Sequence, residues 1–163
     1  MDDKIKELRS RYSEVLLIIL DSAIINFSAT RKGHNVAERK IVREYEYWAK
    51  FPISKVIGAM VVYNTKKCYL KGCDEKYLRG IVRNINENEI KKLRLFTDEQ
   101  LEDVLKKVKE ETIGKCSLCK EGYIFDLKNK LTVIKCKCLK EFENKKLKIL
   151  KENNAWFNNL GEI

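Results

Sequence analysis

The chain is poor in residues that break helices, because its 163 residues include one proline, Pro52, and seven glycines. This scarcity favours long helices. There is also only one histidine, His34, and it lies among basic residues, where a surface position is a simpler interpretation than a metal ligand or catalytic base. With no phosphate-binding loop and no nucleophile next to a candidate base, we expect no enzymatic activity.

Long apolar runs are absent as well. The most apolar stretch, residues 15–20, has six residues, whereas a helix that spans a bilayer needs about 20. The N-terminus opens with Asp2 and Asp3, unlike a secretory signal. We therefore expect a cytoplasmic protein without a membrane segment, whose cysteines are metal ligands or reduced core residues rather than disulfides.

Positive charge is in surplus, with 34 lysines and arginines against 24 acidic residues and a formal net charge of +10. A basic balance favours a polyanionic partner, although a lysine-rich proteome would produce the same composition. The surplus is uneven, because residues 115–151 contain eleven lysines and four acidic residues. This segment would stay positively charged even with four thiolates bound to Zn²⁺.

Apolar residues at spacings of three and four predict five helices in the first 111 residues. The expected ranges are 3–28, 36–50, 53–64, 75–86 and 98–111. Capping residues are expected at three of the starts: Asn35 with Glu38, Asp74, and Thr97 with Gln100. The aromatic residues Tyr45 and Trp48 are expected in the core, whereas Trp156 and Phe157 are candidates for exposure to a partner.

The composition changes after residue 111, where paired cysteines and a strand pattern begin. Residues 122–127 and 131–135 flank a short turn, 128–130, and predict a β-hairpin. A helix is expected after Cys138, with one apolar face (Leu139, Phe142, Leu147, Ile149, Leu150) and one basic face (Lys140, Lys145, Lys148, Lys151). The predicted fold is mainly α: a helical domain 1–111, a treble-clef-like or zinc-ribbon-like module 112–154, and a tail 155–163.

Four cysteines carry the strongest chemical signal. Cys116 and Cys119 form a C-x2-C pair, and Cys136 and Cys138 form a C-x-C pair beyond the predicted hairpin. Zinc favours four ligands in a tetrahedron, and a module so poor in apolar residues gains folding free energy from a structural metal. An iron–sulfur cluster, two disulfides or reduced core cysteines are the alternatives. Cys68 and Cys73, which have no second pair beside them, are interpreted as ordinary loop cysteines.

The run CSLCKEGYIFDLKNKLTVIKCKCLKEFENKKLKIL resembles the cysteine-rich segment ahead of the ATPase domain in phage and bacterial replicative helicase loaders. The matching positions are Cys116, Cys119, Gly122, Ile124, Cys136 and Cys138. The family's ATPase loop, G-x4-G-K-[ST], is missing here, so ATP hydrolysis is not implied. The chain would be a short relative, a fragment of a longer protein, or an unrelated protein that shares a zinc module.

Two basic helix faces are candidates for nucleic-acid binding. Lys76, Arg79 and Arg83 share one face of the predicted helix 75–86, and Lys140, Lys145 and Lys148 belong to the helix after the cysteines. A solvated helix face is the alternative for helix 75–86. We expect a zinc-finger-like protein that binds nucleic acid, DNA in particular, in replication or transcription of a phage or mobile element. The rivals are an adaptor for a replication protein, such as a helicase or polymerase, and a homodimer formed through helix 3–28.

Overall fold

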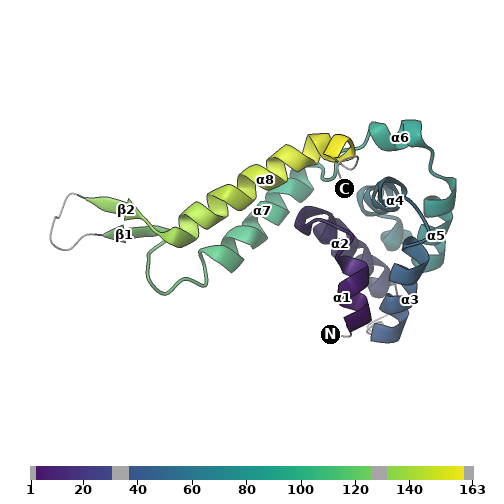
Figure 1. Ribbon diagram of the computed structural model, residues 1–163, viewed down its shortest axis with the longest axis horizontal. Coiled ribbons are helices and arrows are strands. Elements are labelled where there is room, and N and C mark those ends of the chain that lie inside the picture. The colour runs from purple at the N-terminus through teal and green to yellow at the C-terminus, as the bar shows by residue number, and fades with distance from the viewer. Residues whose placement is uncertain (1–2, 31–36, 126–131, 160–163) are drawn as a thin grey trace. The chain divides into compact units, whose positions relative to one another are not determined.

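The computed structural model describes residues 3–30, 37–125 and 132–159. Within them the chain forms eight α-helices, one 3₁₀ helix and one two-stranded sheet (Figure 1). The elements are α1 (Asp3–Arg9), α2 (Glu14–Ala29), α3 (Glu38–Trp48), α4 (Ile53–Thr65), η1 (Cys68–Lys71), α5 (Glu75–Asn84), α6 (Glu87–Lys91), α7 (Asp98–Thr112), β1 (Tyr123–Phe125), β2 (Val133–Lys135) and α8 (Lys137–Asn159). The predicted fold class, mainly helical with a small hairpin–helix module, is confirmed. The predicted cap Asn35, His34 and the turn 128–130 lie outside the described residues.

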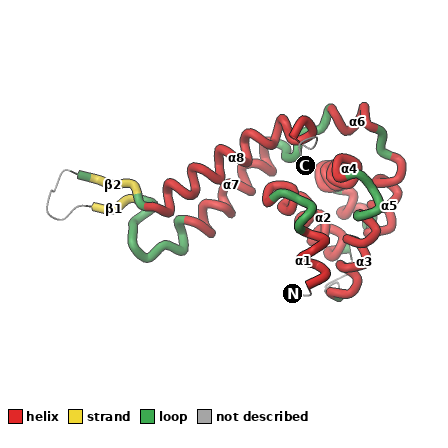
Figure 2. The backbone as a smooth tube through the Cα atoms, in the orientation of Figure 1, coloured by secondary structure: helices red, strands yellow, loops and turns green. Residues whose placement is uncertain are grey.

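The chain divides into two compact units. Unit 1 comprises Met1–Leu95 with Asn154–Ile163, and unit 2 comprises Phe96–Asn153. The sequence placed a boundary after residue 111, but α7 belongs to the same unit as the hairpin. One link within unit 2 is a hydrogen bond of 2.8 Å from the backbone amide of Phe96, just before α7, to the side-chain oxygen of Asn153 on α8. Both strands belong to unit 2, whereas the described part of unit 1 consists of helices and loops (Figure 2).

The core of unit 1 is built around α4, which packs against α2, α5, α6 and η1. Eight of its 13 residues are buried, as expected for a helix that is apolar on every side. Gly58 lets α6 approach, because a Cβ there would lie 2.9 Å from Cγ1 of Ile90. The predicted core residues Tyr45 and Trp48 are buried, which confirms their assignment.

The predicted single helix 3–28 was wrong, because the chain bends by 118° between α1 and α2. The hydroxyl of Ser13 accepts a hydrogen bond from the amide of Leu16 and starts a new helix there. Across the bend, Arg9 forms an ion pair of 2.6 Å with Asp21. The apolar stripe continues on both sides, so its spacing did not show the break. The homodimer hypothesis, which relied on one long helix, loses that support.

The bend also bears on membrane crossing. Among the described residues no single helix has the length and apolar character to cross a membrane, and α1 with α2 would meet those criteria only as a bent pair.

Trp156, a candidate for exposure to a partner, is buried instead. Trp156 is 2% exposed, and its indole N–H donates a 2.8 Å hydrogen bond to the carbonyl of Leu93 within unit 1. Residues 155–157 belong to α8 instead of a separate tail. The apolar face of α8 shifts accordingly: Ile149 is buried, but Leu147 and Leu150 are exposed. The spacing of apolar residues therefore predicted the helix correctly, but it placed the exposed residues Leu147 and Leu150 on the same apolar face as Ile149.

Candidate metal centre

The two cysteine pairs lie at the two ends of the β1–β2 hairpin in unit 2. Cys116 and Cys119 belong to the loop before β1, whereas Cys136 and Cys138 lie at the start of α8. The strands pair antiparallel, with Tyr123 opposite Lys135, and so bring the second pair back to the first. The amide of Cys136 then donates a 2.7 Å hydrogen bond to the carbonyl of Gly122, which fastens the start of α8 to the loop.

The four sulfurs form one compact cluster. The Sγ atoms of Cys116 and Cys136 lie 3.8 Å apart, those of Cys119 and Cys138 lie 3.3 Å apart, and all four lie within 4.8 Å of one another. All four cysteines are free thiols. A tetrahedral site with metal–sulfur bonds of ~2.3 Å has sulfur–sulfur edges of about 3.8 Å. The cluster therefore has the donor set and the size to hold one metal ion.

The helix dipole at this cluster favours the thiolate form of its cysteines, which is the form that binds a metal ion. The carbonyl of Cys136 accepts from the amide of Lys140, so both cysteines of the second pair lie at the positive end of α8. The pKa of the Cys116 thiol falls to about 7, chiefly because of a hydrogen bond with the Leu118 backbone. Desolvation is the main cause that raises the pKa values of Cys119 and Cys138. The Cys116 thiol therefore ionises readily whereas those of Cys119 and Cys138 resist ionisation, and a bound divalent cation removes that resistance.

The turn between Cys119 and β1 requires glycine at position 122. Glu121 and Gly122 both have positive φ, 52° and 92°, and this sharp turn carries the chain from the first pair into the strand. A Cβ on Gly122 would lie 2.9 Å from Cβ of Leu139 on α8. Backbone strain and a clash with α8 therefore both oppose any side chain at this position.

We expect Gly122→Ala to destabilise the metal module by about 1–3 kcal/mol through backbone strain alone, with the clash adding to it. The variant should release its metal faster than the wild-type protein to a chromophoric chelator. Gly80→Ala in α5 is the matched control, because a Cβ there has nothing within 4 Å and φ is not positive. Equal metal release from both variants would show that the turn tolerates a side chain.

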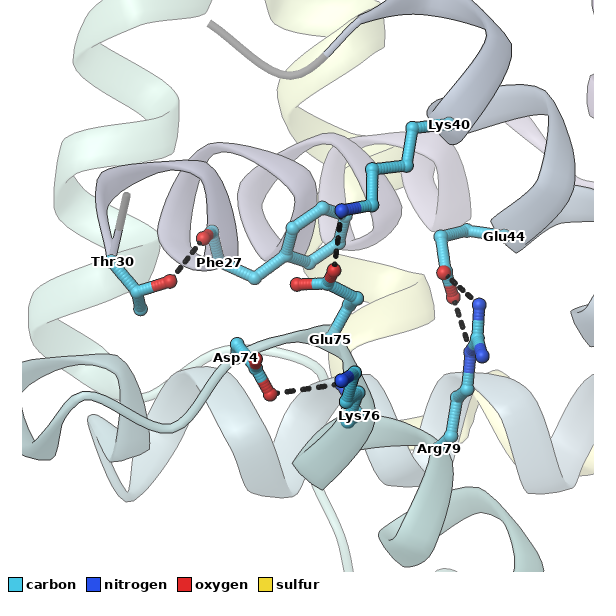
Figure 3. A network of polar contacts seen from close by, with 8 residues as sticks. All are labelled: Phe27, Thr30, Lys40, Glu44, Asp74, Glu75, Lys76 and Arg79. Carbon is cyan, nitrogen blue, oxygen red and sulfur yellow. Dashed lines mark hydrogen bonds and ion pairs between the residues drawn. The ribbon is translucent and has the colours of Figure 1, made fainter. Parts of the chain in front are cut away.

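The predicted basic face of α5 is only partly available. Arg79 donates hydrogen bonds from Nε and Nη2 to the carboxylate of Glu44 on α3, with 3.1 Å for the Nε bond (Figure 3). This ion pair raises the pKa of Arg79. Lys76 and Arg83 are exposed, so only these two of the three residues are open to a ligand.

The predicted lysines of α8 are all exposed. Lys145 forms a surface ion pair of 3.1 Å with Glu141, and Lys140 and Lys148 are exposed as well. At about 100° per residue, Lys137, Lys140, Lys148 and Lys151 fall within about 80° of the helix circumference. They lie opposite the stripe of Ile149, Asn153 and Trp156, which is buried. We call these four lysines the α8 basic stripe.

Cys68 and Cys73 lie in and just after η1, in unit 1. Both are free thiols. In the described part of the chain they do not belong to a metal-ligand cluster. The backbone at Cys73 helps to hold the fold together, because its carbonyl accepts a 2.6 Å hydrogen bond from the hydroxyl of Tyr63.

Comparisons with protein-family models, with curated proteins and with solved structures found no match. Function is therefore inferred from the residues themselves. The sequence identified the four cysteines and Gly122, but it did not identify Tyr123 and Phe125 as exposed residues beside them. Their spacing of two along a strand was the available signal, because alternate residues share a face.

Proposed function

We propose that the chain is a zinc-containing nucleic-acid-binding protein that acts in replication or transcription of a phage or mobile element, with DNA as the expected partner. Zinc is proposed because four thiolates in a closed tetrahedral set are its typical structural site, and such a set leaves no open position for catalysis. The metal would hold the loop, the hairpin and the start of α8 together.

The observation that carries the proposal is the opposite charge of the two helices in unit 2. The sequence of α8 contains six lysines and three glutamates, whereas α7 contains three lysines and six acidic residues. If the chain were basic only because its proteome is rich in lysine, basic and acidic residues would not be divided between the two helices in this way. The α8 basic stripe can neutralise successive phosphates, and the acidic α7 keeps a polyanion away from its own surface.

We expect Lys140→Ala/Lys148→Ala to weaken binding and to reduce its salt dependence. Each phosphate contact contributes about 0.9 to the slope of log affinity against log salt on duplex DNA and about 0.7 on a single strand. Fluorescence anisotropy with labelled single- and double-stranded DNA and RNA, at several salt concentrations, measures both quantities.

The matched control is Lys106→Ala/Lys107→Ala, which removes the same charge from exposed positions of α7. This control should keep a slope close to that of the wild-type protein. An equal effect of both variants would mean that overall charge, and not the α8 basic stripe, drives binding. Failure of the wild-type protein to bind any of the four nucleic acids at low salt would overturn the proposal.

A protein adaptor is the second candidate, and one groove favours it. A hollow of about 750 Å³ in unit 1 is lined by α4, α5 and α6 and the residues after α6, with Ile81, Ile85 and Leu93 among its apolar residues. Two lysines, Lys66 and Lys92, line it against one glutamate, Glu89, so an apolar helix with acidic neighbours would suit it. A Gly80→Arg variant that loses a partner such as a helicase or polymerase, while nucleic-acid binding persists, would support this candidate.

A further inference from the structure

The β1–β2 hairpin carries large apolar side chains that the described part of the chain leaves in solvent. Their exposed fractions run from 38% for Ile124 to 60% for Phe125, and the others are Tyr123, Val133 and Ile134. A single exposed apolar residue is ordinary, but five on one short hairpin mark a surface with a binding role. The cysteine cluster lies at the base of this hairpin, before β1 and after β2.

The two faces of the hairpin differ in chemistry. Tyr123 is opposite Lys135, and Phe125 is opposite Val133, so these four residues share one face. Ile124 and Ile134 are opposite each other on the second face. The first face, which we call the aromatic face, therefore combines two rings with a cation, whereas the second face is aliphatic.

The aromatic face is also hollowed. A depression of about 360 Å³ is lined by Lys120, Glu121, Tyr123, Phe125 and Val133. Lys120 therefore provides a second cation beside the rings. Lys135 forms an ion pair of 3.1 Å with Glu143, but both side chains are about half exposed, so a phosphate can replace the glutamate at little cost.

We propose that Tyr123 and Phe125 are a stacking site for unpaired bases, and that the nucleic acid bound by this protein is single-stranded. Lys120 and Lys135 hold the adjoining phosphates. This inference rests on the proposed nucleic-acid-binding function and adds the class of nucleic acid to it. Flat rings next to cations are the usual means by which proteins bind single strands without reading their sequence.

The spacing of the rings excludes a regular duplex. Residues two apart on a strand lie about 6.8 Å from each other, whereas duplex DNA advances about 3.4 Å per nucleotide on each strand. Successive bases can stack on both rings only when they are pulled apart from each other. An unpaired strand permits this separation, and a paired helix keeps its bases stacked inside.

Charge distinguishes this occupant from an apolar protein surface. Four lysines flank the rings and the cysteines in the sequence: Lys115, Lys120, Lys135 and Lys137. Within the described hairpin and its adjoining loop there is one acidic residue, Glu121. An apolar partner alone would leave these lysines near an uncharged surface. A phosphate backbone that carries stackable bases satisfies both the rings and the lysines.

The test uses the full metal-loaded chain and a labelled oligothymidylate, with a duplex for comparison. Phe125→Ala and Tyr123→Ala should each weaken single-strand binding about tenfold. Because stacking releases no counterions, the salt slope should stay unchanged, unlike that of the Lys140→Ala/Lys148→Ala variant. Phe125→Trp, unlike Phe125→Ala, should bind the single strand about as tightly as the wild-type protein, because it keeps an aromatic ring at position 125. An iodouracil-substituted strand should cross-link to residue 123 or 125.

The matched control is Ile124→Ala/Ile134→Ala on the other face, which should change affinity less than twofold and keep the same metal content. Equal losses from the two faces would overturn the stacking site. Unchanged binding of both single strand and duplex by the aromatic variants would overturn it while the proposed function stands. If the rings are needed for binding to anionic lipid vesicles and not to oligonucleotide, the hairpin is a lipid-binding surface and the inference is wrong.

Discussion

Stripping the metal with a strong chelator should unfold the hairpin and its cysteine loop while the core of unit 1 stays folded. In the described residues from Gly114 to Cys138, only Gly122 and Cys136 are buried. Apolar burial therefore cannot hold this segment, and metal binding supplies about 10–16 kcal/mol in small zinc modules. Unit 1 instead has its own core around Trp48 and α4.

Hydrogen exchange with and without chelator measures this difference residue by residue. Protection should disappear from β1, β2 and the first turn of α8, and should persist in α2 and α4. Elemental analysis should find one zinc per chain, and iron with sulfide would instead identify a cluster. Equal loss of protection in both units would show that the metal supports the whole chain.

Cysteine variants make the same point without a chelator. Cys116→Ser/Cys138→Ser should lose the metal, because it removes one sulfur from each pair. Cys73→Ser is the control, since Cys73 is half-buried in unit 1 and far from the cluster in sequence. Full zinc occupancy in the double variant would contradict the assignment of these ligands.

Features set by neighbouring residues were predictable from the sequence. The side chains of Asp74 and Thr97 cap α5 and α7 as expected, and Gln100 completes the capping box. The four cysteines met because a hairpin joins them, and spacing alone indicated the hairpin. In each case the interaction lies within a few residues or within one supersecondary unit.

Features set by distant partners could not be predicted in this way. Glu44 and Arg79 are 35 residues apart in the sequence. The spacing of basic residues on α5 therefore predicted a cationic face but gave no sign that Arg79 pairs with Glu44. The short helix α6 has one buried residue, Ile90, and lies outside the five helices that the spacing of apolar residues predicted. Contacts such as the one from Trp156 to Leu93, 63 residues away, determine which apolar residues of α8 are buried.

The Glu44–Arg79 pair leads to the second large expected effect. Glu44 has a side chain only 1% exposed, and its carboxylate accepts both hydrogen bonds from Arg79. The guanidinium also lies 5.1 Å from the ring centre of Tyr47. Removing Arg79 would leave a buried carboxylate without its cation, which is the costly way to break such a pair.

We therefore expect Arg79→Ala to lower the free energy of unfolding by about 3 kcal/mol, near the lower end of the range for broken buried pairs because Arg79 itself is partly exposed. Arg79→Lys should be intermediate, since an ammonium cannot make both bonds of the planar guanidinium. Urea denaturation followed by the fluorescence of Trp48 and Trp156, both in unit 1, measures these differences.

Arg83→Ala is the decisive comparison, because Arg83 lies one turn further along α5 and is exposed. It should change stability by no more than about 0.5 kcal/mol. Any loss of nucleic-acid affinity in an Arg79→Ala/Arg83→Ala variant must therefore be corrected for unfolding caused by Arg79 alone. The Glu44→Ala/Arg79→Ala double variant should recover part of the stability lost in Arg79→Ala, since it removes the stranded charge. If Arg79→Ala and Arg83→Ala were equally stable, Glu44 would be able to hold its charge without Arg79, and the ion pair would have no structural role.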